Sequence, residues 1–133
     1  LQHIEPFGVY EGQTIGFKGT VAGLPAKDFF NRVEELLNRK PLVFPYGPEK
    51  IFCVGIVSGG AARLVEDALA AGLDAYLTGE PAESSLHLAK EGGIHFIAGG
   101  HYATEKWGVI ALGEHLEKTF SLKVRFVDLE NPV

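Results

Sequence analysis

The chain has 133 residues, of which 46% are hydrophobic and 22% are charged, and its formal net charge is −5. This length suits one domain with a normal core, and the composition is that of a globular rather than a disordered chain. The acidic balance argues against nucleic-acid binding, and no apolar run approaches the roughly 18 residues of a membrane span. The single Cys53 excludes an intramolecular disulfide and suits a reducing compartment, so we expect a cytoplasmic protein.

The first half of the chain predicts a short lead-in to a sheet and one helix. Residues 1–12 contain one proline and two glycines, so we expect an irregular segment there, followed by a strand over 13–21. Apolar residues at helical spacing predict an amphipathic helix over 24–40, with Pro25 in its first turn. A short strand over 41–44 completes this half.

The second half alternates regularly between apolar, β-branched runs and helical patterns. The run "KIFCVGIVS" is expected to be a strand buried on both faces. Strand–helix units in series favour parallel pairing, with helices packed on the sheet faces. We therefore predict an α/β fold with a largely parallel or mixed sheet. The predicted strands are 50–58, 73–79, 94–100 and 122–129, and the predicted helices are 61–72, 83–93 and 101–120.

We expect residues 1–133 to form a single α/β domain, with 1–49 as the lead-in and 50–133 as the strand–helix units that carry the functional motif. The chain begins at Leu1 and contains no methionine. We therefore expect it to be part of a longer protein, and we expect any site argued from its residues to be incomplete.

The ends of the predicted central strands are rich in glycine and polar residues. They read "SGG" (58–60), "LTGE" (77–80) and "AGGH" (98–101). Ligands of open α/β sheets bind beyond the carboxyl ends of the strands, so these loops predict a site at one edge. Taken alone, "SGG" is more typical of a tight turn than of an anion-binding loop.

His101 and Glu105 are the residues of this edge that most clearly suggest chemistry. A four-residue step on a helix rotates by about 40° and rises by roughly 6 Å, so the two side chains share one face. Val109, Leu112 and Leu116 fall on the same side, which predicts that the pair continues a core-facing stripe. A buried pair of this kind either bonds internally or shares a metal ion. Spacing alone favours the internal bond, because a catalytic metal site needs at least three protein ligands.

The remaining histidines differ in what they suggest. His87 follows Glu80 by seven residues on a predicted helix, and we expect it near the same edge. His95 lies within a predicted strand, where alternation points it away from the side of its two neighbours. His115 is expected to be a surface residue, and His3 carries no signal.

Three stretches together resemble a known family. They are "LDAYLTGE" (73–80), "SLHLAKEGGIHFIAGGHYATEKWGVIAL" (85–112) and "VRFVDLENPV" (124–133). They are similar to the C-terminal half of the Nif-three-like family, whose dinuclear metal-centre members are labelled GTP cyclohydrolase I type 2-like. The resemblance implies that His101 and Glu105 are metal ligands, and that Glu80 and His87 lie beside the ligands or contact substrate.

The same resemblance implies two divalent metal ions, zinc, iron or manganese, shared with residues absent from this chain. The family's other ligands, an adjacent His-His pair and an Asp, have no match here. The family fold is two α/β lobes around a cleft, assembled into hexameric rings. The implied function is a metal-dependent, cyclohydrolase-like hydrolase of a small nucleotide, with the isolated chain inactive and with neither nucleic acid nor membrane as a partner. The alternatives are a non-catalytic metal-binding, regulatory or scaffold module, and a folded domain whose His–Glu pair is only a hydrogen bond.

Overall fold

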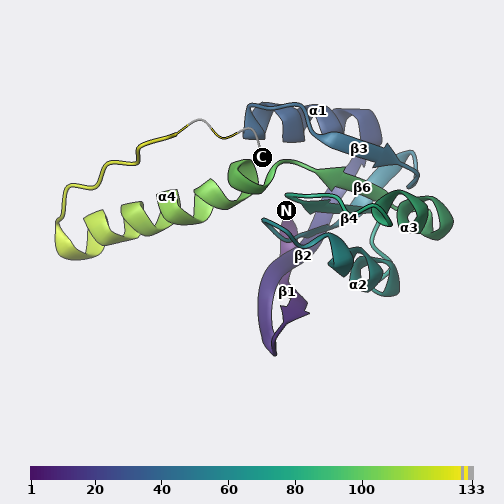
Figure 1. The fold of residues 1–133 in the computed structure, drawn as a ribbon, viewed down its shortest axis with the longest axis horizontal. Coiled ribbons are helices and arrows are strands. Elements are labelled where there is room, and N and C mark those ends of the chain that lie inside the picture. Colours follow the sequence, from purple (N-terminus) through teal and green to yellow (C-terminus); the bar gives the residue numbers. More distant parts are fainter. Residues whose placement is uncertain (130, 132–133) are drawn as a thin grey trace.

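A computed structural model describes residues 1–129 and 131 of the chain. Its strands are β1 (Gln2–Tyr10), β2 (Gln13–Pro25), β3 (Leu42–Pro45), β4 (Lys50–Ile56), β5 (Ala75–Thr78) and β6 (His95–Ala98). The described residues form one six-stranded sheet in the order β1-β2-β4-β5-β6-β3 (Figure 1). The central strands β4, β5 and β6 run parallel, while β1, β2 and β3 join antiparallel. The predicted α/β class with a mixed sheet is therefore confirmed.

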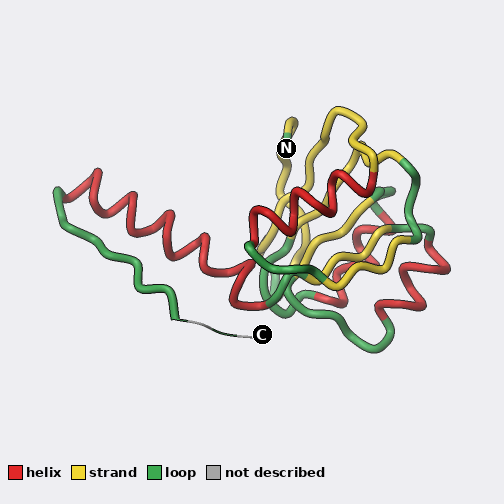
Figure 2. Tube along the Cα trace, turned by 90° about the horizontal axis from the view of Figure 1, so that it is seen from above, coloured by secondary structure: helices red, strands yellow, loops and turns green. Residues whose placement is uncertain are grey.

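Helices cover both faces of this sheet (Figures 1 and 2). They are α1 (Ala26–Leu37), the 3-10 turn η1 (Ala62–Leu64), α2 (Val65–Ala70), α3 (Ser85–Gly92) and α4 (His101–Phe120). On one face, α1 and the first turn of α4 bury Phe29, Val33 and Ala103 against the sheet. On the other face, α2 and α3 bury Val65 and Ala89. Each face thus has its own apolar core, with the sheet between them.

The prediction of an irregular segment over residues 1–12 is wrong, because β1 pairs with β2 as a hairpin. The connection is a two-residue turn in which Glu11 and Gly12 have φ values of 49° and 79°. Positive φ at both central positions is the geometry that matches the twist of the flanking strands. Pro6 lies in β1, which is an edge strand, the part of a sheet where proline is tolerated.

Two further elements differ from prediction in their limits and burial. The helix predicted over 24–40 spans only Ala26–Leu37, because Asn38 takes a left-handed φ of 51° and ends it. Near its start, the strand β4 is buried on one face and not on both as predicted, since Phe52 is 53% exposed while Ile51 is fully buried.

Within residues 1–129 and 131, no helix combines the length and apolarity needed to cross a bilayer.

The predicted core-facing stripe of α4 is wrong. Val109 is 62% exposed and Leu112 is 56% exposed, and Leu116 is only half-buried. The cause is visible in Figures 1 and 2, where α4 touches the sheet near its first turn and then projects beyond it. Amphipathic spacing identifies the apolar side of a helix, but it does not show that a partner surface extends along its whole length.

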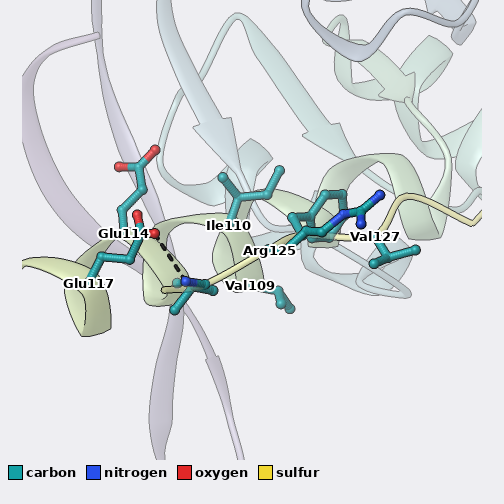
Figure 3. A pocket seen from close by; sticks show the side chains of 9 residues that line it. Val109, Ile110, Glu114, Glu117, Arg125 and Val127 are labelled. Atoms are coloured by element: carbon teal, nitrogen blue, oxygen red, sulfur yellow. Dashed lines mark hydrogen bonds between the residues drawn. The ribbon is translucent and has the colours of Figure 1, made fainter. Parts of the chain in front are cut away.

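The strand predicted over 122–129 is also wrong. The described part of this segment runs back along α4 as an extended chain that belongs to no sheet (Figures 1 and 2). The Val124 N–H donates to the Glu117 carboxylate at 3.0 Å, and Lys106 pairs with Asp128 at 3.1 Å. A shallow apolar pocket separates helix and segment, with Val109 and Val127 among its lining (Figure 3).

Candidate functional site

The three glycine-containing loops predicted to share an edge are bonded directly to one another. The Gly79 N–H donates to the Gly59 carbonyl at 2.9 Å, and the Gly100 N–H donates to the Gly79 carbonyl at 2.8 Å. The Gly99 N–H donates to the Thr78 carbonyl at 2.8 Å. The loops after β4, β5 and β6 therefore form one hydrogen-bonded layer, the loop floor, and α4 begins directly after it.

Thr104 locks the start of α4 onto this floor, and sequence reasoning missed it. Its hydroxyl accepts the Gly59 N–H at 3.1 Å and donates to the Gly100 carbonyl at 2.9 Å. From the opposite side, the buried Thr78 hydroxyl donates to the Gly59 carbonyl at 3.1 Å. A Thr in the first turn of a helix that follows Gly-Gly was the available signal, since Thr often bonds to nearby backbone there.

His101, the first residue of α4, stands between two carboxylates. Its Nδ1–H donates to Glu80 Oε1 at 2.6 Å, and its Nε2 lies 3.2 Å from Glu105 Oε2. The side chains of His101, Glu80 and Glu105 are 38%, 43% and 53% exposed, so the predicted buried pair is a cluster open to solvent. The His101–Glu105 contact that spacing favours is present as an ion pair, while the hydrogen bond of the ring goes from Nδ1 to Glu80.

Both carboxylates favour the protonated imidazole. The hydrogen bond to Glu80 raises the pKa of His101 above its ordinary value, partial burial opposes this, and the charge of Glu105 adds to the rise.

We expect the pKa of His101, followed by its ring proton signals in a metal-free NMR titration, to lie above 6.5 and to fall in the variant Glu80→Gln. Because the folded pKa is raised, the stability that this pair contributes is fully present below about pH 6.5. It is lost as the pH rises through the folded value. An identical His101 pKa in the wild type and in Glu80→Gln would contradict this assignment.

The cluster fits one side of a metal centre. Two ligand atoms bound at about 2.0–2.2 Å to one ion with a near-tetrahedral angle lie about 3.3 Å apart, close to the Nε2–Oε2 separation of 3.2 Å. Glu80 holds Nδ1–H and so directs the lone pair of Nε2 outward, as carboxylates beside metal-bound histidines do. A Cβ added at Gly59 would overlap the Glu105 carboxylate. Glycine at position 59 therefore leaves room for the Glu105 side chain.

The described residues do not supply enough ligands for such a centre. Within residues 1–129 and 131, no three His, Cys, Asp or Glu side chains are grouped so as to hold one ion. The reason is geometric: Glu80 and Glu105 lie on opposite nitrogens of the same ring and do not converge on one point.

The other predicted candidates lie apart from the cluster. His87 is exposed on α3, and none of the described contacts of His101, Glu80 or Glu105 involves it. His95 is buried and structural, because its Nδ1 accepts the Gly47 N–H at 3.1 Å and its Nε2–H donates to the Pro48 carbonyl at 2.8 Å.

Comparison with known proteins places these observations in a family context. A family model described as Duf34/NIF3 (NGG1p interacting factor 3) matches residues 1–132. The chain is 43% identical over 110 residues to the GTP cyclohydrolase 1 type 2 homolog of Haemophilus influenzae, covering 82% of this chain and 44% of that protein. The protein of the same name from Pseudomonas aeruginosa is 47% identical over 105 residues, or 79% of this chain and 41% of that protein. The chain therefore spans less than half the length of these relatives.

Solved structures agree with the fold described above. The protein ybgI, described as of unknown function, superposes with a TM-score of 0.87 at 36% identity, over 98% of this chain and 53% of that one. The protein TTHA1606 from Thermus thermophilus gives a TM-score of 0.76 at 30% identity, over 97% of this chain and 51% of that one. Reduced HcgD from Methanocaldococcus jannaschii gives 0.78 at 23% identity, over 92% and 49%, a likeness of fold alone.

Proposed function

The chain belongs to the Duf34/NIF3 family, and from this premise we propose that it supplies one side of a metal centre in a hydrolase of small nucleotides. In this proposal His101 and Glu105 are metal ligands, and Glu80 orients His101. The remaining ligands come from protein outside the described residues. The divalent ions that suit imidazole and carboxylate ligands here are zinc, iron and manganese.

One observation carries the proposal. The Nδ1–H of His101 is held by Glu80 at 2.6 Å, while Nε2 and Glu105 Oε2 stand side by side at 3.2 Å. The buried His95 is bonded on both ring nitrogens by backbone groups, and His101 differs from it. The His101 ring is fixed on one nitrogen and presents the other, next to a second acidic oxygen, at the solvent-open edge of the sheet where α/β ligands bind.

The residues have separate roles in the proposed chemistry. A bound metal pair would supply an activated water and polarise a substrate oxygen. Glu105 and His101 hold their position because α4 is fixed by Thr104 to the glycine loops. Glu80 keeps the tautomer of His101, and its second oxygen, Oε2, can accept a proton from a group bound beside it. The curated relatives are named as cyclohydrolase homologs, which supports a purine nucleotide as the substrate and hydrolytic ring opening as the reaction.

We further propose a homo-oligomer. The exposed apolar side of α4 supports this, because large apolar patches on soluble proteins mark interaction surfaces. Its residues include Val109 and Leu112, which are 62% and 56% exposed.

A zinc titration tests the metal proposal without requiring turnover. We expect the ring signals of His101 to shift at lower Zn²⁺ concentrations than those of His115, which lies on the same helix and is exposed. The physical reason is that His101, unlike His115 in the described part of the chain, has a carboxylate on each side, one to orient it and one to share the ion. If Zn²⁺ perturbs His115 as readily as His101, the proposed ligand pair is not a metal site.

A further inference from the structure

A cavity of about 460 Å³ adjoins the His101 cluster. It lies between the β1–β2 hairpin and the loops that follow β4 and β5, and its lining includes Tyr10, Ile15, Gly60, Arg63 and Glu80. This volume is within the range of small-molecule sites, and the lining is mostly apolar with a few polar groups. The sequence predicted a site at the loops after β4 and β5, but it did not indicate the other wall of this cavity, because the hairpin was expected to be irregular.

The cavity ends at the proposed metal ligand. Glu80 lines it and also bonds to His101 at 2.6 Å. Gly60 lines it too, and a Cβ placed there would lie 3.7 Å from both Glu80 Oε2 and His101 Cε1. A molecule filling the cavity would therefore touch Glu80 at the end where His101 stands. Glycine at position 60 adds no side chain to this approach.

The polar groups of the cavity differ in charge and position. Arg63 is exposed, and among the described residues its guanidinium makes no hydrogen bond or ion pair. Glu80 uses Oε1 for His101, whereas Oε2 carries no hydrogen bond within residues 1–129 and 131. Tyr10 and Ile15 line the same cavity and offer aromatic and aliphatic surface. An unpaired guanidinium suits a phosphate, a free carboxylate oxygen suits an N–H donor, and an aromatic ring suits a planar partner.

We propose that this cavity binds a phosphorylated amino-heterocycle. Arg63 contacts the phosphate, Tyr10 packs on the ring, and Glu80 Oε2 accepts a ring or amino N–H. This assignment rests on the proposed function in one respect, namely that the bound ring then lies beside the metal ligand His101. The cavity itself needs no metal, so its occupancy can be measured in metal-free protein.

Calorimetry with GMP, guanosine and inorganic phosphate, in the presence of EDTA, tests the proposal. We expect GMP to bind more tightly than either fragment. Arg63→Ala is expected to weaken GMP binding by about tenfold and to leave guanosine binding unchanged, since a charge-assisted hydrogen bond is lost. Arg63→Lys keeps the charge and should retain most of the affinity. Arg32→Ala, which removes an exposed arginine on α1, is the matched control and should bind GMP like the wild type.

Three results would overturn the proposal, of which the first two are no GMP binding by the folded wild type and equal affinities for GMP in Arg63→Ala and Arg32→Ala. Equal affinities for phosphate and GMP would also overturn it, because the ring would then contribute nothing. The zinc titration of His101 is read separately. If zinc shifts His101 and GMP does not bind, the cavity assignment fails alone; if GMP binds and zinc leaves His101 unchanged, the metal proposal fails alone.

Discussion

Replacing Gly79 by alanine is expected to lower the free energy of unfolding by about 3 kcal/mol. Gly79 is buried at the centre of the loop floor, and a Cβ there would lie 2.7 Å from the Gly59 carbonyl oxygen and 2.8 Å from the His101 Cα. Both neighbours are backbone atoms, so neither can rotate away. The methyl group must push apart the loops that Gly79 joins by its own N–H and carbonyl. Urea unfolding followed by circular dichroism measures the loss.

Gly108→Ala is the matched control for this substitution. Gly108 lies within α4, it is exposed, and an added Cβ would meet no atom within 4 Å. Alanine is a better helix former than glycine, so this variant should gain about 0.5–1 kcal/mol. The two variants add the same methyl group with opposite expected signs. A Gly79→Ala protein as stable as the wild type would show that the three loops are not tightly packed.

The sequence predicted the part of the fold that positions the site. From residue 50 to residue 120, strands and helices alternate as expected, because the runs are long, their periodicity is clear and glycines mark their ends. Parallel pairing then brings the ends of successive strands to one edge, which is why the three glycine loops meet. This result follows from local patterns together with one topological rule.

The wrong predictions share a physical cause: the local sequence pattern of a segment does not show which other segment it pairs with or packs against. Residues 122–129 have the apolar character of a strand, yet the described segment pairs with none and lies along α4. Residues 1–12 look irregular, yet β2 provides a partner and Glu11–Gly12 a suitable turn, so β1 forms. Val109 is apolar at the right spacing, yet it is exposed, because α4 projects beyond the sheet after its start.

The site was predicted in outline and not in detail. His101 and Glu105 lie side by side because helical geometry alone ensures it, and Glu80 joins them because β5 and β6 are neighbours. No sequence pattern shows that Glu80 takes Nδ1 while Glu105 takes Nε2, since this depends on rotamers set by the loop floor. His87 follows Glu80 by one loop and less than one helical turn, and it is nevertheless exposed and outside the cluster's described contacts.

His101→Ala is expected to abolish the binding of Zn²⁺ at the His101–Glu105 pair, which is the largest functional effect that we predict. Without the imidazole, Glu105 is a lone exposed carboxylate, and Glu80 has no ring to orient. Calorimetric titration with Zn²⁺ measures the change, with circular dichroism to verify the fold. His115→Ala removes a histidine from the exposed part of the same helix and should bind like the wild type. Equal affinities in the two variants would remove His101 from the proposed centre.

The variant Glu80→Gln separates two effects of Glu80 on His101, namely the orientation of the ring and the negative charge beside it. The amide oxygen of glutamine can still accept the Nδ1–H of His101, so the ring keeps its direction while the negative charge behind it disappears. Loss of such a supporting carboxylate lowers metal affinity by about 10- to 100-fold, so we expect a value between those of the wild type and His101→Ala. The same variant lowers the pKa of His101 and so reduces competition from protons, which partly offsets the loss at lower pH. The penalty caused by Glu80→Gln should therefore grow as the pH rises, whereas a purely structural role for Glu80 would give a penalty that does not depend on pH.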